Sequence, residues 1–250
     1  VLEELASLFP EAAISTLVLR RGSLTAAMAV RHWQVSPLGR IAPRFIDHRK
    51  LLPLYPWAVR CLRVPSGTRL LLSSDAALIK GLRKPAGCVH VCYCHSPARY
   101  LWDLSEDYLA RTAGIGGPGR WLFRRVLPRL RRVDCEAAAK VDYFIANSQF
   151  VAERIRRIYG REAAVIAPPV AVDRFAGPEI APGDYYLVVS ELVSYKRVDL
   201  AVAACSRSGR KLIVAGDGPA RATLAAAAGS SVRFVGRVGD AEEIGRASCR

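Results

Sequence analysis

The stretch 185–200, Tyr-Tyr-Leu-Val-Val-Ser-Glu-Leu-Val-Ser-Tyr-Lys-Arg-Val-Asp-Leu, decides the fold class of this chain. It reads as an apolar strand, a short polar loop that ends in the basic pair Lys196-Arg197, and the start of a helix. This order places backbone N–H groups and a lysine at the carboxyl edge of a parallel sheet, where a diphosphate can bind. The segments 212–219 and 232–238 add two more strand patterns. The sequence therefore predicts a nucleotide-binding α/β unit.

Apolar strands alternate with helical patterns through the rest of the chain as well. Strand patterns fall at 13–19, 70–73, 88–94, 141–147 and 163–167, and helical patterns near 75–80, 98–110, 120–139, 148–159, 197–206 and 218–228. This alternation predicts an α/β fold with parallel sheets covered by helices on both faces. Residues 174–184 are rich in Pro and Gly and lack periodicity, so we expect an N-terminal unit 1–176 and a C-terminal unit 177–250.

The composition is that of a core-forming protein with a strong positive charge. The chain has 250 residues, of which 51% are hydrophobic and 24% charged, and its formal net charge is +15. No apolar run reaches the roughly 18 residues of a membrane-spanning helix. Residues 1–5 resemble part of an amphipathic helix rather than a signal peptide. The charge favours anionic partners, and seven irregularly spaced cysteines indicate reduced thiols and a cytoplasmic location.

His95 directly follows the apolar strand 88–94. We expect it at the carboxyl end of that strand, facing the crevice where ligands bind in open α/β sheets. A histidine there can act in catalysis or can simply bond to the backbone, and the residues alone leave both interpretations open.

The same strand carries His90, Cys92 and Cys94 on one face, which could suggest a metal site. No second ligand pair at zinc-finger spacing accompanies them. Small residues in a buried strand explain the pattern better, so we expect no metal here.

Four further positions stand out at strand ends. Lys196 precedes a helix and would add a point charge to an anion site built from N–H groups. Gly216 and Gly218 would let the backbone pass close to a ligand, although Gly-Asp-Gly-Pro is also common in ordinary turns. Ser148 is the predicted N-cap of a helix with an apolar face at Val151, Ile155 and Ile158.

Together these segments resemble the family-4 retaining glycosyltransferases of GT-B fold, which use nucleotide sugars. Residues 93–97 (Tyr-Cys-His-Ser-Pro) and 99–103 (Arg-Tyr-Leu-Trp-Asp) resemble a characteristic segment of a mannosyltransferase-like subgroup. Residues 146–148 resemble the family's Ala-Asn-Ser junction, and 168–175 resemble the segment that leads into the second domain. The resemblance implies two Rossmann-like domains with parallel sheets, the second incomplete.

The resemblance also implies roles for individual residues. His95 would be catalytic or would position the transferred sugar. The family often has a basic residue five positions before its donor lysine; that position is Glu191 here, which leaves Lys196 as the main diphosphate contact. No Asp-x-Asp pair is present, so no metal or other cofactor is implied. The remaining implied contacts are Arg197, Ser190, Gly216 and Gly218 for the donor and Ser96, Arg99, Trp102, Asn147 and Ser148 in the cleft.

The implied partners are a nucleotide-sugar donor and a lipid-linked or glycan acceptor of cell-envelope polysaccharide synthesis. The subgroup implies GDP-mannose, and UDP-sugars stay open.

The basic segment 120–132 could lie on an anionic membrane at the inner face of the plasma membrane. Its arginines would then contact the headgroups, and Trp121 and Phe123 would lie at the interface. It could equally be a surface helix with a core-facing stripe.

Both ends of the chain bear on the expected activity. In the family, a Gly-rich loop would precede Val1 and a paired-glutamate segment would follow the last residues. Residues 243–250 also match one translated frame of a sequencing adapter. We therefore expect a fragment truncated at both ends and inactive by itself.

Other functions remain as alternatives. A GT-B epimerase is possible, whereas a phosphorylase needs a pyridoxal-binding lysine context that the sequence lacks. A basic nucleic-acid-binding protein would use the arginines as phosphate contacts. The arginines are spread over both predicted units, and no helix-turn-helix, zinc-finger or RNA-recognition signature is present. We therefore expect no nucleic-acid partner.

Overall fold

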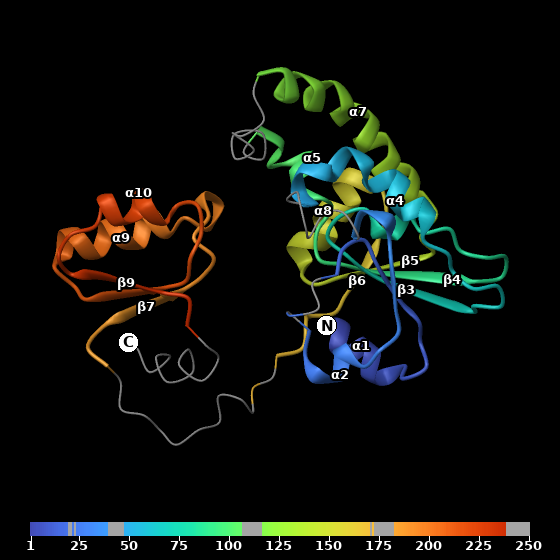
Figure 1. Cartoon of the computed structure of the whole chain (residues 1–250), viewed down its shortest axis with the longest axis horizontal. Coiled ribbons are helices and arrows are strands. Elements are labelled where there is room, and N and C mark those ends of the chain that lie inside the picture. The colour runs from blue at the N-terminus through green and yellow to red at the C-terminus, as the bar shows by residue number, and fades with distance from the viewer. Residues whose placement is uncertain are drawn as a thin grey trace. The chain divides into compact units, whose positions relative to one another are not determined.

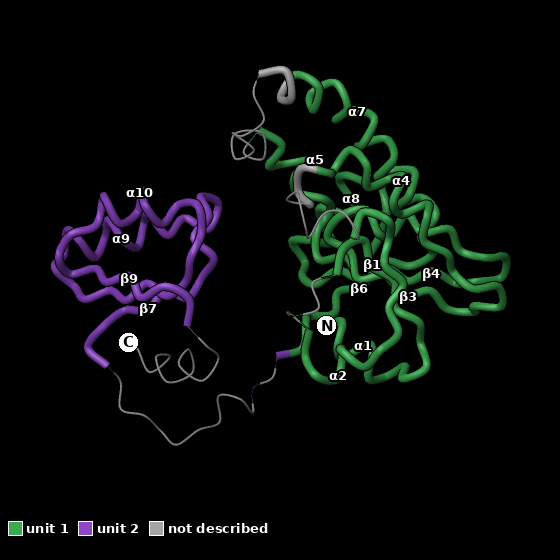
Figure 2. Tube along the Cα trace, in the orientation of Figure 1, with its two compact units in different colours: residues 1–169 green, residues 170–250 purple. Residues whose placement is uncertain are grey.

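The chain divides into two compact units, Val1–Pro169 and Val170–Arg250 (Figure 2). The computed structural model describes residues 1–19, 22, 24–39, 48–106, 117–170, 172 and 183–238. The expected boundary between 176 and 177 lies outside these residues, as does the segment 243–250. Within the described parts, every strand pair is parallel. The predicted α/β class with parallel sheets is confirmed.

The first unit is built on a four-stranded sheet. Its strands follow the order β3-β4-β5-β6, namely Leu70–Asp75, Val89–Cys94, Tyr143–Ala146 and Ala163–Val165. Asp75 lies opposite Cys94, and Cys94 lies opposite Ala146. Because the strands are parallel and in this register, the residues that follow them meet at one edge of the sheet. A separate two-stranded sheet joins β1, Ile14–Thr16, to β2, Trp33–Val35.

Helices surround this sheet (Figure 1). They are α1 Leu2–Leu8, α2 Ala26–Ala29, α4 Tyr55–Cys61, α5 Arg99–Trp102, α7 Gly117–Ala139 and α8 Gln149–Tyr159, with 3₁₀ turns η2 His48–Leu54 and η3 Ile79–Gly81. The Ser148 hydroxyl accepts the backbone N–H of Val151 at 3.3 Å, which confirms the predicted N-cap of α8. Gly160 ends this helix in the left-handed conformation, with φ of 64°. None of the described helices is long and apolar enough to span a membrane.

The helix predicted near 75–80 is wrong. Strand β3 continues through Asp75, and only the short turn η3 follows. One carboxylate oxygen of Asp75 accepts the backbone N–H groups of Ala77 and Ile79. Such local side-chain bonds compete with helical ones, so the chain turns instead of entering an α-helix. Strand β2 and helix α4 were not predicted, because their short apolar stretches lack a clear period.

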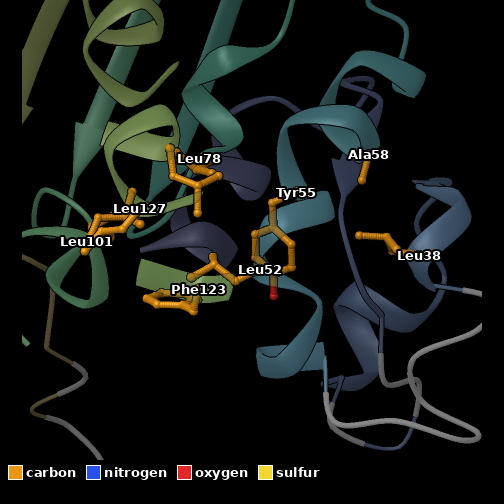
Figure 3. Close-up of a cluster of buried hydrophobic side chains, with 10 residues drawn as sticks. Leu38, Leu52, Tyr55, Ala58, Leu78, Leu101, Phe123 and Leu127 are labelled. Atoms are coloured by element: carbon orange, nitrogen blue, oxygen red, sulfur yellow. The ribbon is translucent and has the colours of Figure 1, made fainter. Parts of the chain in front are cut away.

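Two buried clusters hold the first unit together. Helix α7 contributes Phe123, Leu127 and Leu130 at helical spacing to one buried cluster. In Figure 3, Phe123 lies near Leu52 and Leu127 lies near Leu101. A second cluster joins β4 and β5 to α8 through side chains that include Cys92, Phe144 and Ile155. The apolar stripe of α8 therefore covers the sheet that carries His95, whereas the stripe of α7 packs on the neighbouring turns and helices.

The second unit is a three-stranded sheet with the order β7-β8-β9. These strands are Tyr186–Val189, Leu212–Ala215 and Val232–Gly236, and the unit also contains the turn η5 Ser194–Lys196 and the helices α9 Val198–Ser208 and α10 Arg221–Ala226. Both helices lie on the same side of the sheet in Figure 1. Val202 of α9 and Leu224 of α10 pack on Leu212 and Val214 of β8 in one buried cluster.

The candidate metal residues of β4 are part of the core. His90, Cys92 and Cys94 are all buried. Among the described residues, no three potential ligands lie together as a metal site requires. His90 shares a 2.8 Å hydrogen bond between Nε2 and the Ser73 hydroxyl. Burial, assisted by the Lys84 charge, lowers the pKa of His90 to about 4, and burial raises the pKa of Cys94 to about 12.

This buried neutral histidine makes the first unit acid-sensitive. Between pH 6.5 and pH 4 the unfolded chain protonates His90 and the folded chain does not, so the free energy of unfolding falls as the pH falls. We expect His90→Gln to remove as much as about 3 kcal/mol of that dependence. Denaturant unfolding at pH 7.0 and 4.5, followed by tryptophan fluorescence, measures it, because Trp33, Trp57, Trp102 and Trp121 all belong to this unit.

The control is His32→Gln, since His32 is exposed. This variant is expected to keep the pH dependence of the unchanged chain. An identical pH dependence in the His90→Gln variant would contradict the prediction.

Candidate functional site

His95 lies one residue beyond β4, at the carboxyl edge of the four-stranded sheet. Its backbone N–H donates to the Asp75 carbonyl at 2.8 Å, and its own carbonyl accepts the Asn147 side-chain amide at 3.1 Å. Asp75 belongs to β3, and Asn147 follows β5. These bonds tie the His95 backbone to both neighbouring strands, so its position is set by the sheet.

The His95 imidazole is also held in place. Its Nε2 shares a 2.9 Å hydrogen bond with the Ser74 hydroxyl, and the Tyr93 ring meets it edge-on at 5.2 Å between centroids. Partial burial lowers the pKa of His95, and the Asp75 carboxylate acts in the opposite direction. The ring is therefore neutral at pH 7, with one nitrogen able to donate and one able to accept a hydrogen bond.

Ser74 was not among the residues singled out in the sequence. The signal that could have found it is the polar pair Ser73-Ser74 at the end of an otherwise apolar strand. Successive residues of a strand point to opposite faces. Ser73 accordingly meets His90, and Ser74 meets His95.

Asn147 and Ser148, which the resemblance implies for the cleft, lie at the same edge of the sheet as His95. The Ser148 hydroxyl donates to the Asn147 side-chain oxygen at 3.0 Å. The amide nitrogen of Asn147 bonds to the His95 carbonyl, so both ends of this amide are fixed. Ser96 forms a local bond from its hydroxyl to the Pro97 carbonyl. The structure thus brings His95, Asn147 and Ser148 together at one edge of the sheet.

Helix α5 holds the other two residues predicted for the cleft. Arg99 is exposed at its first position. Trp102 is half-buried, and its indole N–H donates to the buried carboxylate of Asp134 at 2.8 Å. The Arg131 guanidinium lies over its ring, 5.3 Å from the centroid. The indole N–H of Trp102 is therefore used to satisfy a buried carboxylate. The sequence pattern did not indicate this role.

In the second unit, Lys196 is exposed at the end of η5, directly before α9. Its ammonium group lies 6.0 Å from the Tyr195 ring centroid and has no ion-pair partner in the described part of the chain. Arg197, in contrast, is paired with Asp199 through two N–H···O bonds of 3.0 Å. Of the two predicted donor cations, Lys196 is the one whose charge is not already balanced.

Gly216 and Gly218 serve a packing role that the sequence did not reveal. Their φ angles are 132° and 157°, and a Cβ on either one would overlap the carbonyl oxygen of Ser190 or Leu192, respectively. The Ser190 N–H donates to Ala215 and the Leu192 N–H to Asp217. The two loops beyond β7 and β8 are therefore locked backbone to backbone, which fixes the segment that leads to Lys196.

The basic helix α7 has two distinct faces. Trp121 is 59% exposed, and the Arg125 guanidinium lies over its ring at 4.9 Å. Leu122, Arg129 and Arg132 are exposed as well. Phe123 is only 7% exposed and belongs to the core. The expectation that Phe123 reaches a membrane interface is wrong, because it lies on the core-facing stripe of the helix.

A hollow of about 800 Å³ lies between α1, β1 and β3. Most of its lining is apolar, as at Leu5, Ile14 and Leu72, and Ser74 is among its polar lining residues. His95 is not part of its lining. We therefore separate this hollow from the edge of the sheet where the predicted site residues meet.

One comparison identifies the family. A comparison with curated proteins found no match. A family model described as Glycosyltransferase Family 4 matches residues 4–174, which is more than half of the chain. The parallel α/β architecture agrees with the Rossmann-like GT-B fold expected for such a domain. The chain therefore belongs to glycosyltransferase family 4, and it is a sugar transferase.

Proposed function

We propose that this protein transfers a sugar from a nucleotide diphosphate donor, with retention of configuration, to a lipid-linked or glycan acceptor of the cell envelope. The donor that we favour is GDP-mannose, because residues 93–103 resemble a mannosyltransferase-like subgroup. The observation that carries the proposal is His95, a neutral and firmly held imidazole at the ligand-binding edge of a parallel sheet.

His95 would act on the transferred sugar. Because Nε2 of the neutral imidazole bonds to Ser74, Nδ1 is the nitrogen left to face a sugar hydroxyl. Asn147, fixed at both ends, holds the His95 carbonyl and keeps the backbone from shifting when a ligand binds. A preorganised contact of this kind lowers the barrier only if its geometry is kept during the reaction.

Lys196 would stabilise the leaving group. Breaking the bond between the sugar and the diphosphate puts additional negative charge on the departing phosphate. A lysine ammonium and the N–H groups that open α9 can offset that charge without a metal ion. Support for this role is the exposed ammonium of Lys196, which pairs with no carboxylate among the described residues and stands at the end of a loop that backbone bonds hold in place.

We expect Lys196→Ala to weaken GDP binding by about tenfold or more, because a hydrogen bond to a charged group contributes about 1.5–3 kcal/mol. Calorimetric titration of the whole chain with GDP and with UDP measures this and also ranks the two nucleotides. The matched control is Arg207→Ala, which removes an exposed cation from the last turn of the same α9 helix. Equal losses in both variants would mean non-specific attraction to a basic protein and would contradict the proposed donor site.

We propose further that the exposed face of α7, formed by Trp121, Leu122, Arg125, Arg129 and Arg132, binds the anionic membrane that holds the acceptor. Arginines match anionic headgroups, and a tryptophan with an exposed ring suits the interface.

Co-sedimentation with vesicles of phosphatidylglycerol and phosphatidylcholine at 0.15 M salt tests this. Arg125→Ala and Arg129→Ala are each expected to weaken binding about fivefold, since a basic residue near an anionic surface contributes about 1 kcal/mol. Trp121→Ala is expected to weaken it too, whereas Phe150→Ala, which removes an exposed aromatic ring from α8, is the control. Unchanged binding in the three α7 variants would contradict the assignment.

A further inference from the structure

Lys80, in the turn η3, is fully buried, which is rare for a lysine. Its ammonium group donates to Asp75 Oδ2 at 2.9 Å, to Asp134 Oδ1 at 2.5 Å and to the Ala77 carbonyl at 3.1 Å. Three N–H donors thus meet three acceptors. We call Lys80, Asp75 and Asp134 the Lys80 cluster.

The carboxylates of the cluster are also satisfied on their other sides. Asp75 accepts two backbone N–H groups of the following turn. The second oxygen of Asp134 accepts the Trp102 indole N–H and the Tyr159 hydroxyl, each at 2.8 Å. Burial by itself lowers the pKa of Lys80, but Asp75 and Asp134 raise it well above the ordinary value, so the ammonium stays charged. Buried charges are tolerated only when they are paired and hydrogen-bonded in this way.

The cluster connects elements that are far apart in the sequence. Asp75 ends β3, and Asp134 lies on α7, 54 positions after Lys80. Trp102 and Tyr159 add α5 and α8. One ammonium group therefore fixes the carboxyl end of β3 against three helices.

That end of β3 is also where His95 is held. The Asp75 carbonyl accepts the His95 N–H, and the adjacent Ser74 hydroxyl bonds to the His95 ring. Displacing Asp75 would move both partners of His95 at once. Among the described residues, Lys80 and Asp134 make no hydrogen bond or ring contact with the His95 side chain, so their structural effect on His95 passes through Asp75 and β3.

We propose that the Lys80 cluster positions His95 for sugar transfer. Lys80 anchors the Asp75 side chain, Asp75 holds the carboxyl end of β3, and β3 presents Ser74 and the Asp75 carbonyl to His95. Lys80 and Asp134 are thus positioning residues. The effect of the Lys80 cluster on catalysis rests on the proposed function of His95. The effect of the cluster on the position of the His95 ring does not depend on that function.

NMR of the imidazole signals in the whole chain tests the geometric part, because the chain has only four histidines. In Lys80→Met, His95 is expected to lose the signature of its Nε2 hydrogen bond, and its pKa is expected to rise toward the ordinary value of about 6.5 as water reaches the ring. The charged side chain that acts on this ring is Asp75, and the variant leaves it in the chain.

Two control variants accompany this measurement, one expected to change the His95 signals and one expected to leave them unchanged. Ser74→Ala removes the bond to the ring directly and shows the signature of a released His95. Lys84→Met breaks the nearby exposed ion pair with Asp142. It is expected to raise the pKa of His90, which the Lys84 charge lowers, and to leave His95 unchanged. If Lys80→Met does not fold, Asp134→Asn replaces it, since this variant keeps the shape of the side chain and removes one charge of the cluster.

Unchanged His95 signals in a folded Lys80→Met or Asp134→Asn variant, with Ser74→Ala shifted, would overturn the proposal. Turnover of GDP-mannose, measured with the same substitutions in the full-length enzyme, separates it from the proposed function. A shifted His95 with a kcat reduced about tenfold or more, at similar KM for the donor, supports both. A shifted His95 with unchanged turnover supports the positioning role and contradicts catalysis by His95.

Discussion

The first unit depends on a buried cation that two carboxylates share. An ammonium group without partners would not remain charged in the interior, and two buried carboxylates without it would repel each other. The Lys80 cluster meets both demands by bringing Asp75 and Asp134 within hydrogen-bond distance of one nitrogen. An arrangement of the helices that separated these groups would leave a buried charge without a partner. The paired charges therefore also fix the carboxyl edge of the sheet, where His95 lies.

The second unit fixes its loops by a different means. The chain has no room for a Cβ at Gly216 or Gly218, and the loops beyond β7 and β8 bond to each other through their backbones. The result is similar, because a loop at the carboxyl end of a parallel strand is held before any ligand binds. Lys196 then extends from a supported backbone, which would reduce the entropy lost in the phosphate contact that we propose for it.

The sequence pattern predicted the fold well wherever apolar strands were bounded by polar turns. Strands β4 and β7 and the Ser148 cap are examples, because strand periodicity and capping act locally. The prediction of a helix near 75–80 was wrong because the Asp75 side chain bonds to backbone N–H groups of the turn that follows it. The burial of Lys80 could not be predicted, since its partner Asp134 is distant in the sequence and a lone lysine is ordinarily exposed. For the same reason the sequence located His95 but not Ser74, which depends on the pairing of β3 with β4.

The measurement that tests this account most directly is a double-mutant cycle of Lys80→Met and Asp134→Asn. Denaturant unfolding followed by tryptophan fluorescence reports the free energy of unfolding of the first unit, which contains every tryptophan of the chain. If the buried charges depend on each other, the double variant is less destabilised than the sum of the single variants, by about 1–3 kcal/mol. Additive effects within about 0.5 kcal/mol would contradict a shared buried cation as the constraint that organises the fold around His95.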